Sequence, residues 1–218
     1  MAINIAIDGP SASGKSTVAD RVCYELDYKH LDTGAMYRCV ALKAKRMNLD
    51  YENEEELQKM LNDIQIDFTP EKGVLLDGED VTSEIRTDDI SMLASTISAK
   101  KIVREKLVAM QQKIAENKGY VMDGRDIGTV VLPDAEVKIF LTASVETRAR
   151  RRYLENKERG IPSNMRELKK EIIERDYQDT HRKNSPLKKA DDAVEIDTSN
   201  MTIGEVVDEI MKLVSKKL

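Results

Sequence analysis

A glycine-rich segment close to the start of the chain has the residue types and spacing of a phosphate-binding loop. It satisfies the pattern G-x-x-x-x-G-K-[ST] with the residues Gly9, Pro10, Ser11, Ala12, Ser13, Gly14, Lys15, Ser16 and Thr17. The two glycines permit backbone angles at which successive N–H groups point toward phosphate oxygens. We expect Lys15 to hold the β- and γ-phosphates of a nucleoside triphosphate, and the Ser16 hydroxyl to contact the Mg²⁺ that accompanies it. The apolar run Ile3–Ile7 before the loop and a helical pattern after it favour a nucleoside triphosphate site over a chance glycine-rich turn.

A phosphate loop occurs in switches, motors and kinases, and other parts of the chain distinguish these classes. The sequence contains neither the D-x-x-G nor the N-K-x-D element of a regulatory GTPase, and a mechanical ATPase usually has a longer chain. A small-molecule kinase must hold a second anionic substrate in line with the γ-phosphate. Arginines suit that task because a guanidinium group can donate two hydrogen bonds to one phosphate. The arginines described next therefore favour a kinase.

Two charged segments follow predicted strands, at the sheet edge where open α/β sheets bind ligands. The first, residues 32–38, places Tyr37 and Arg38 in the first turns of a helix. The second, residues 123–129, puts two glycines and three charged residues between apolar stretches, where charge is costly unless it is used. A helix cap with one exposed arginine, and a tight turn with an internal Asp–Arg pair, are the structural alternatives.

Two more arginine-bearing segments are predicted to be helical. Arg175, Asp179 and Arg182 have the spacing of one helix face, although a solvated face with an ordinary ion pair would have it too. Residues 145–160 contain six basic and three acidic residues. We interpret this segment as a lid whose arginines meet the triphosphate on closure, with a solvated helix as the alternative. At 3.6 residues per turn only about two or three of the arginines can face the same way.

The apolar runs predict an α/β fold. Five continuous runs are typical of strands that are buried on both faces: Ile3–Ile7, Tyr28–Leu31, Tyr120–Met122, Val137–Leu141 and Ala193–Ile196. A turn and a helical pattern follow each, which favours a P-loop NTPase fold with a five-stranded parallel sheet flanked by helices. Alternation at 64–68, turns at 70–73 and 77–78, and an apolar run at 74–76 predict an antiparallel hairpin. We interpret residues 33–103 as an insertion that contains it; the alternative is a hairpin that adds edge strands to the main sheet.

Composition narrows the class of protein further. The 218 residues, 40% hydrophobic and 34% charged, fit one globular domain that carries insertions. The net charge of −5 argues against a nucleic-acid partner. No apolar run approaches the roughly 18 residues of a membrane span, and the first residues lack a secretory signal pattern. We therefore expect a cytoplasmic protein without a membrane or nucleic-acid partner, and a monomer because no coiled-coil pattern or long apolar stripe is present.

Five segments occur in the order found in the bacterial cytidylate kinase family, which the chain resembles nearly end to end. They are IDGPSASGKST (7–17), LDTGAMYR (31–38), GEDVTSEIR (78–86), DGRDIGTVV (123–131) and ERDxxDTHR (174–182). The resemblance implies transfer of a phosphoryl group from ATP to CMP or dCMP. It also implies a core (1–32, 104–147 and 161–218), an enlarged insert that binds the nucleoside monophosphate (33–103) and a short lid (148–160).

The same resemblance implies a role for each acceptor-site residue. Around the cytosine it places Thr33, Arg104, Asp126 and Arg182; on the CMP phosphate Tyr37, Arg38 and Arg125; and at the ribose Ser95, Arg175 and Asp179. Lys15, Arg38 and Arg125 would act in catalysis. At position 33, where relatives can have serine, threonine keeps the hydroxyl and adds a methyl group. The carboxylate of Asp126 would accept from cytosine N4 and repel the carbonyl that uracil has there.

Two functions of other kinds stay open at this point. The nearest is a P-loop kinase for a different small anionic acceptor, such as UMP or a non-nucleotide. The second is a nucleotide sensor without catalytic activity. His30 and His181 suggest no catalytic triad and no metal site, and we expect them to have structural roles.

Overall fold

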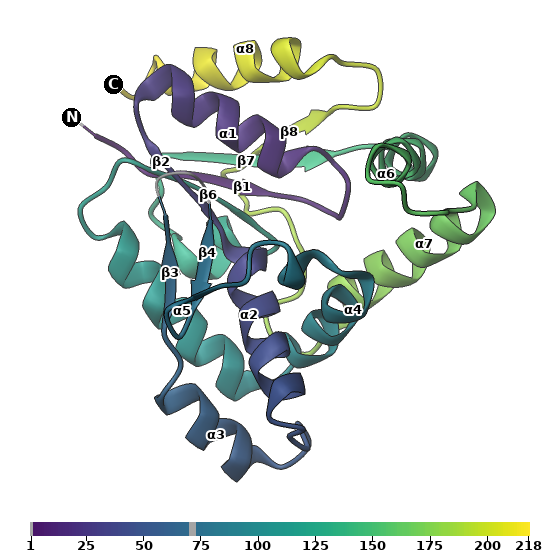
Figure 1. Ribbon diagram of the computed structural model, residues 1–218. Helices are drawn as coiled ribbons and strands as arrows, with labels where there is room; N and C mark the ends of the chain where they lie inside the picture. Colours follow the sequence, from purple (N-terminus) through teal and green to yellow (C-terminus); the bar gives the residue numbers. More distant parts are fainter. Residues whose placement is uncertain (1, 70–72) are drawn as a thin grey trace. The chain divides into compact units, whose positions relative to one another are not determined.

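The first unit of the structure contains a five-stranded sheet with β1 at its centre (Figure 1). The computed structural model describes residues 2–69 and 73–218, which divide into two compact units, Met1–Leu31 with Ala115–Leu218, and Asp32–Ile114. In spatial order, the strands are β2 (Lys29–Asp32), β6 (Tyr120–Gly124), β1 (Ile5–Asp8), β7 (Val137–Thr142) and β8 (Val194–Asp197). β1 runs parallel to β6 and to β7, and β7 runs parallel to β8. The predicted five-stranded parallel sheet is confirmed, and each strand begins within two residues of its predicted start.

Burial along the strands explains why their sequences were recognisable. All four residues of the central strand β1 are buried, and in β6 only Tyr120 is partly exposed. The edge strand β8, in contrast, buries Ile196 alone. A strand with neighbours on both sides and helices nearby needs a continuous apolar run, whereas an edge strand does not.

Helices of the first unit pack on this sheet and on each other. α1 (Lys15–Leu26) and α8 (Ile203–Val214) lie side by side on one face (Figure 1), and their apolar residues share a core with β1 and β7. α6 (Val145–Glu158) and α7 (Met165–His181) form a smaller core around Ala149, Leu168 and Ile172. The helix predicted near 175–182 is present and ends at His181, so that Arg182 follows it with extended backbone. A single π-helical turn, η2 (Ile127–Val131), follows β6.

The second unit contains the predicted hairpin. β3 (Ile66–Phe68) pairs antiparallel with β4 (Val74–Leu76), which pairs with β5 (Glu79–Asp80). These strands form a sheet of their own, so the alternative in which they extend the main sheet is wrong. Residues 70–72 of the predicted turn lie outside the described residues. The unit's helices are α2 (Thr33–Arg46), α3 (Glu54–Asn62), η1 (Glu84–Arg86), α4 (Asp88–Ile97) and α5 (Lys101–Ala115). The exact bounds of core, insert and lid stay predictions.

Helix lengths bear on the predicted absence of a membrane span. The longest helix of the described residues, α7, has 17 residues and carries charged side chains along its length. Within residues 2–69 and 73–218, no helix is long and apolar enough to cross a membrane.

Candidate active site

The phosphate loop joins the carboxyl end of β1 to the start of α1, as its sequence predicts. Gly9 has φ +150°, and a Cβ atom at this position would lie 2.1 Å from the carbonyl oxygen of Leu141. Gly14 has φ +95° and precedes the first residue of α1. Side chains are strained in these conformations, so both positions require glycine. The loop can therefore curl tightly and present backbone N–H groups together with the positive end of α1.

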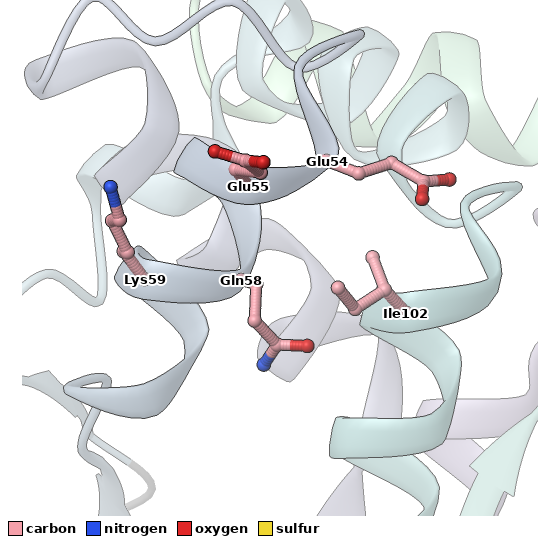
Figure 2. Close-up of a pocket in the computed structure, with 5 residues that line it drawn as sticks. All are labelled: Glu54, Glu55, Gln58, Lys59 and Ile102. Carbon is pink, nitrogen blue, oxygen red and sulfur yellow. The ribbon is translucent and has the colours of Figure 1, made fainter.

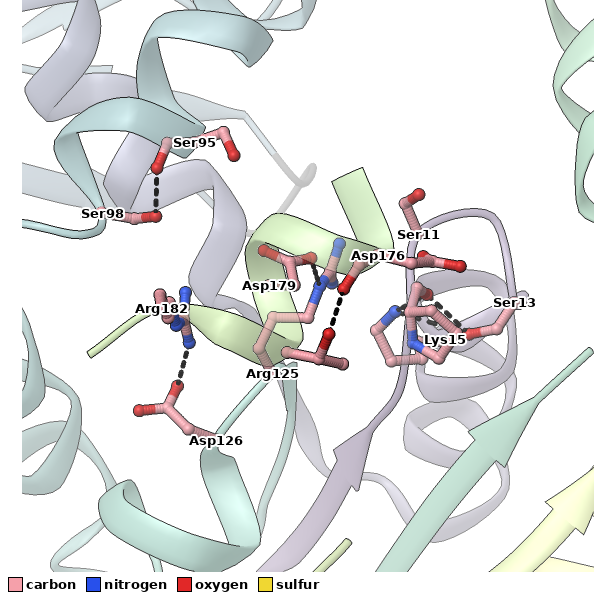
Figure 3. Close-up of polar contacts among 12 residues, drawn as sticks. Ser11, Ser13, Lys15, Ser95, Ser98, Arg125, Asp126, Asp176, Asp179 and Arg182 are labelled. Atoms are coloured by element: carbon pink, nitrogen blue, oxygen red, sulfur yellow. Dashed lines mark hydrogen bonds and ion pairs between the residues drawn. The ribbon is translucent and has the colours of Figure 1, made fainter. Parts of the chain in front are cut away.

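Lys15 lies inside this loop with its side chain buried. Its Nζ donates to the carbonyl oxygen of Pro10 at 2.7 Å (Figure 3). Burial, followed by the nearby positive charge of Arg125, lowers the pKa of Lys15 to about 7, although carboxylates including Asp123 and Asp179 oppose the shift. A buried ammonium that is short of negative charge has strong affinity for an anion such as a triphosphate.

Ser16 begins a chain of hydrogen bonds that the sequence did not reveal. Its Oγ donates to Oδ2 of Asp123 at 2.8 Å, while Oδ1 of Asp123 lies 2.7 Å from Nε2 of His30. Nδ1 of His30 lies 2.9 Å from Oδ1 of Asp20. Burial alone would lower the pKa of His30, but the hydrogen bonds to both carboxylates outweigh it and raise the pKa to about 10. His30 thus lies between two carboxylates and holds Asp123 in place, consistent with the structural role expected for it.

The oxygens of Ser16 and Asp123 fit a magnesium site. A hydroxyl and a carboxylate, 2.8 Å apart beside Lys15, are the hard oxygen ligands that Mg²⁺ prefers. The sequence pointed to Ser16 only. Asp123 is separated from Ser16 by 107 positions, and the two meet because β6 is the neighbour of β1 in the sheet.

Two ion pairs join the segment after β6 to the end of α7. Nε of Arg125 donates to Oδ2 of Asp179 at 2.8 Å, and a guanidinium nitrogen of Arg182 lies 4.0 Å from Oδ1 of Asp126 (Figure 3). Burial by itself would raise the pKa of Asp179, but Arg125, with Arg175 and Arg182 nearby, holds that pKa below its ordinary value. Five of the residues predicted to bind the acceptor are thus brought together in the first unit.

Two arginines of α6 contact the phosphate loop directly. Nη1 of Arg148 donates to the carbonyl oxygen of Ser11 at 3.4 Å, and Nη1 of Arg151 donates to that of Ser13 at 3.2 Å. Arg148 also forms a two-pronged ion pair with Asp176 of α7. From the sequence we expected about two or three arginines of residues 145–160 to face the triphosphate, but the sequence did not show which ones. Their spacing of three residues places these two on one face of the helix.

The remaining predicted acceptor residues lie in the second unit. A guanidinium nitrogen of Arg38 lies 2.7 Å from Oδ2 of Asp32, whose Oδ1 accepts from the N–H of Ala35 and so caps α2. The guanidinium of Arg104 lies over the ring of Tyr37, 5.3 Å from its centroid.

Ser95 is linked to this group through Ser98, and Thr33 starts α2. Nη1 of Arg104 donates to the carbonyl oxygen of Ser98 at 3.2 Å, and Oγ of Ser98 donates to the carbonyl oxygen of Ser95 (Figure 3). Thr33 is buried as the first residue of α2. The ten predicted acceptor residues therefore form two sets, five in each unit.

A shallow depression elsewhere in the second unit contains none of the predicted residues. It lies between α3 and the start of α5 and is lined by Glu54, Glu55, Gln58, Lys59 and Ile102 (Figure 2). Its lining has no arginine to receive a phosphate. Among the described residues, no group of histidine, cysteine or carboxylate side chains is arranged to hold a metal ion on its own.

Comparison with known proteins gives the family. Residues 5–216 match the family model for cytidylate kinase. A cytidylate kinase of Bacillus cytotoxicus is 53% identical over 219 residues, covering 99% of this chain and 97% of the relative. One of Ligilactobacillus salivarius is also 53% identical, with the same coverage.

Solved structures agree with the fold. A shikimate kinase of Bacteroides thetaiotaomicron superposes with a TM-score of 0.51 at 12% identity, covering 99% of both chains. An uncharacterised protein of Eubacterium ventriosum superposes with a TM-score of 0.54 at the same identity and coverage. At this identity the likeness concerns the fold alone. The family match and the close relatives go further: this chain belongs to the cytidylate kinase family, a family of ATP-dependent nucleoside-monophosphate kinases.

Proposed function

We propose that this chain transfers the γ-phosphoryl group of ATP to CMP or dCMP, giving ADP and CDP or dCDP. The observation that carries the proposal is the proximity of two sites at the carboxyl ends of β1 and β6. The first site is the phosphate loop that contains Lys15. The second is a charged acceptor site, formed by Arg125 and Asp126 and by the residues with which they form ion pairs, Asp179 and Arg182. The electrostatic influence of Arg125 on Lys15 supports this proximity.

On the donor side, the chain binds the triphosphate through residues 9–17. Lys15 and the loop N–H groups hold the β- and γ-phosphates, and Arg148 and Arg151 approach the same loop from α6. Ser16 and Asp123 would hold Mg²⁺, which when bound neutralises phosphate charge. No covalent intermediate is required, because phosphoryl transfer depends mainly on alignment and charge stabilisation.

On the acceptor side, arginines lower the repulsion between two anions. Arg38 and Arg125, with Tyr37, bind the CMP phosphate, so that one of its oxygens can approach the γ-phosphorus in line. That oxygen forms the new bond to phosphorus while the bond to the β-phosphate oxygen of ATP breaks and ADP leaves. Each well-placed arginine can be worth on the order of 10³ in rate.

Selection of the base rests on Asp126. Its carboxylate accepts from the N4 amino group of cytosine, whereas uracil offers a carbonyl oxygen that the carboxylate repels. The guanidinium of Arg182 lies 4.0 Å from this carboxylate and places a complementary charge beside it. Thr33 and Arg104 complete the cytosine site, and the ribose meets Ser95, Arg175 and Asp179.

Exclusion of water completes the mechanism. Closure of the lid and the insert over the substrates prevents the loss of ATP by hydrolysis. We further propose that the protein acts as a cytoplasmic monomer in pyrimidine nucleotide metabolism.

One experiment tests the proposed function. Purified protein with ATP and Mg²⁺ is offered CMP, dCMP, UMP, AMP or shikimate, and release of ADP is followed. ADP release that depends on CMP or dCMP supports the proposal. Preference for another acceptor identifies a different P-loop kinase, and nucleotide binding without turnover identifies a sensor; either result refutes it.

A further inference from the structure

The carboxylate of Asp8, the last residue of β1, caps a turn that belongs to another part of the chain. Its Oδ1 accepts from the backbone N–H of Ile127 and its Oδ2 from that of Gly128, both at 2.7 Å. These are the first two N–H groups of η2, and such groups have no acceptor within their own helical turn. Asp8 is buried, 4% exposed, and its negative charge faces the positive end of η2.

This contact fixes the backbone on both sides of Arg125 and Asp126. On the near side, Gly124 is paired with Asp8 across the β1–β6 ladder. On the far side, Ile127 and Gly128 are bound by the side chain of Asp8. The two residues between these anchors are the ones that carry the acceptor-binding arginine and the base-selecting carboxylate.

Asp8 also adjoins the phosphate loop. The residue after Asp8 is Gly9, the first residue of the phosphate loop. One carboxylate therefore connects the start of the ATP site to the segment that reads the acceptor.

Stability alone gives no reason for a charged group at this place. Burial raises the pKa of Asp8 to about 6 in spite of the two N–H donors, and Asp126 adds to the shift while Lys15 opposes it. Ionised Asp8 therefore lowers the free energy of unfolding near neutral pH. What it supplies is a rigid, two-pronged attachment, which is the requirement for aligning two substrates.

We propose that Asp8 is a positioning residue, which touches neither substrate and holds Arg125 and Asp126 in register with the phosphate loop. The inference rests on the proposed function, so CMP-dependent turnover of the wild-type protein is established first. Its absence would refute the proposed function without testing Asp8.

The test uses Asp8→Asn, which keeps the shape and one acceptor but turns an amide N–H toward a backbone N–H. We expect kcat/KM for CMP to fall by about 10²-fold, the effect of a small misplacement at a reacting centre. The preference for CMP over UMP should fall as well, while the affinity for ATP, measured by calorimetry, stays within about threefold. Equal losses for ATP and CMP, or CMP kinetics within twofold of wild type, would overturn the proposal.

Two further variants make the test specific. Glu136→Gln is a matched control, because Oε2 of Glu136 accepts from the N–H of Asn4 at 2.9 Å beside the opposite end of β1; it should leave the CMP kinetics unchanged. Asp8→Glu keeps both carboxylate oxygens but lengthens the side chain by one methylene group, so it displaces the start of η2 from β1 and should lower kcat/KM for CMP. Should Asp8→Asn fail to fold, Asp8→Glu decides: wild-type CMP kinetics in that variant overturn the proposal.

Discussion

Nε of Arg125 donates to Oδ2 of Asp179 at 2.8 Å, which links the segment after β6 to α7. We assign the two residues to different parts of CMP, the phosphate and the ribose. Their contact means that opposite charges hold the proposed acceptor site together. Such an ion pair would lower the entropic cost of binding CMP, because it orders both side chains.

The selectivity for cytosine is tested by Asp126→Ala. Loss of a hydrogen bond to a charged group costs about 1.5–3 kcal/mol, so the ratio of kcat/KM for CMP to that for UMP should fall about 10- to 150-fold. A coupled assay of ADP release measures both values. An unchanged ratio would remove Asp126 from the role of base selector.

Lys15→Ala tests the phosphate loop. Removing one well-placed cation from the developing charge should lower kcat by about 10²- to 10³-fold or more. Circular dichroism serves as the control for folding, since α1 begins at this residue. Near-normal turnover in a folded variant would contradict the assignment of Lys15.

The pKa of Lys15 predicts a proton linked to nucleotide binding. With a pKa of about 7, Lys15 is mostly neutral at pH 8, and a bound triphosphate raises the pKa of an adjacent ammonium. Binding of ATP at pH 8 should therefore take up close to one proton, and at pH 6, where Lys15 is already charged, much less. Calorimetry in buffers of different ionisation enthalpy measures the uptake.

Lys15→Arg provides the control for this linkage, because arginine stays protonated at both pH values. The variant should bind ATP with little proton uptake. Uptake that is the same in wild type and variant would assign the proton to another group.

The ion pair between α6 and α7 is expected to contribute to the free energy of unfolding. Arg148 is buried with a side chain 4% exposed, and its ion pair with Asp176 is a short one. Asp176→Ala leaves this guanidinium without its carboxylate and should lower the free energy of unfolding by about 2–3 kcal/mol, less than for a fully buried pair because Asp176 is partly exposed. Urea titration gives the value.

An exposed ion pair offers the comparison. Glu209 and Lys212 on α8 lie 2.7 Å apart with both side chains at least half exposed. Glu209→Ala should change the free energy of unfolding by less than about 0.5 kcal/mol. If both variants lower the free energy of unfolding by the same amount, burial of Arg148 does not strengthen its ion pair with Asp176.

Local patterns were sufficient to predict much of the fold. The sheet followed from continuous apolar runs, the phosphate loop from glycine spacing, and the hairpin from alternation near Ile66 and Val74. In each case the physical cause lies within about ten neighbouring residues, because burial and backbone angles set the pattern directly.

Contacts between distant segments could not be predicted in the same way. The hydrogen bonds between Ser16 and Asp123 and between Asp8 and Gly128 form only because β6 lies next to β1 in the sheet. No local sequence pattern predicts the order of the strands. For the same reason the sequence could not select Arg148 and Arg151 among the arginines of α6. Their partners belong to the phosphate loop.

The proposed function depends most on one claim, that Arg38 and Arg125 both bind the phosphate of CMP. A crystal structure of the protein with CMP bound tests it most directly. The claim predicts that Arg38 and Arg125 both donate to the CMP phosphate, with Asp126 accepting from cytosine N4. A phosphate bound by only one of these arginines, or a cytosine turned away from Asp126, would contradict it.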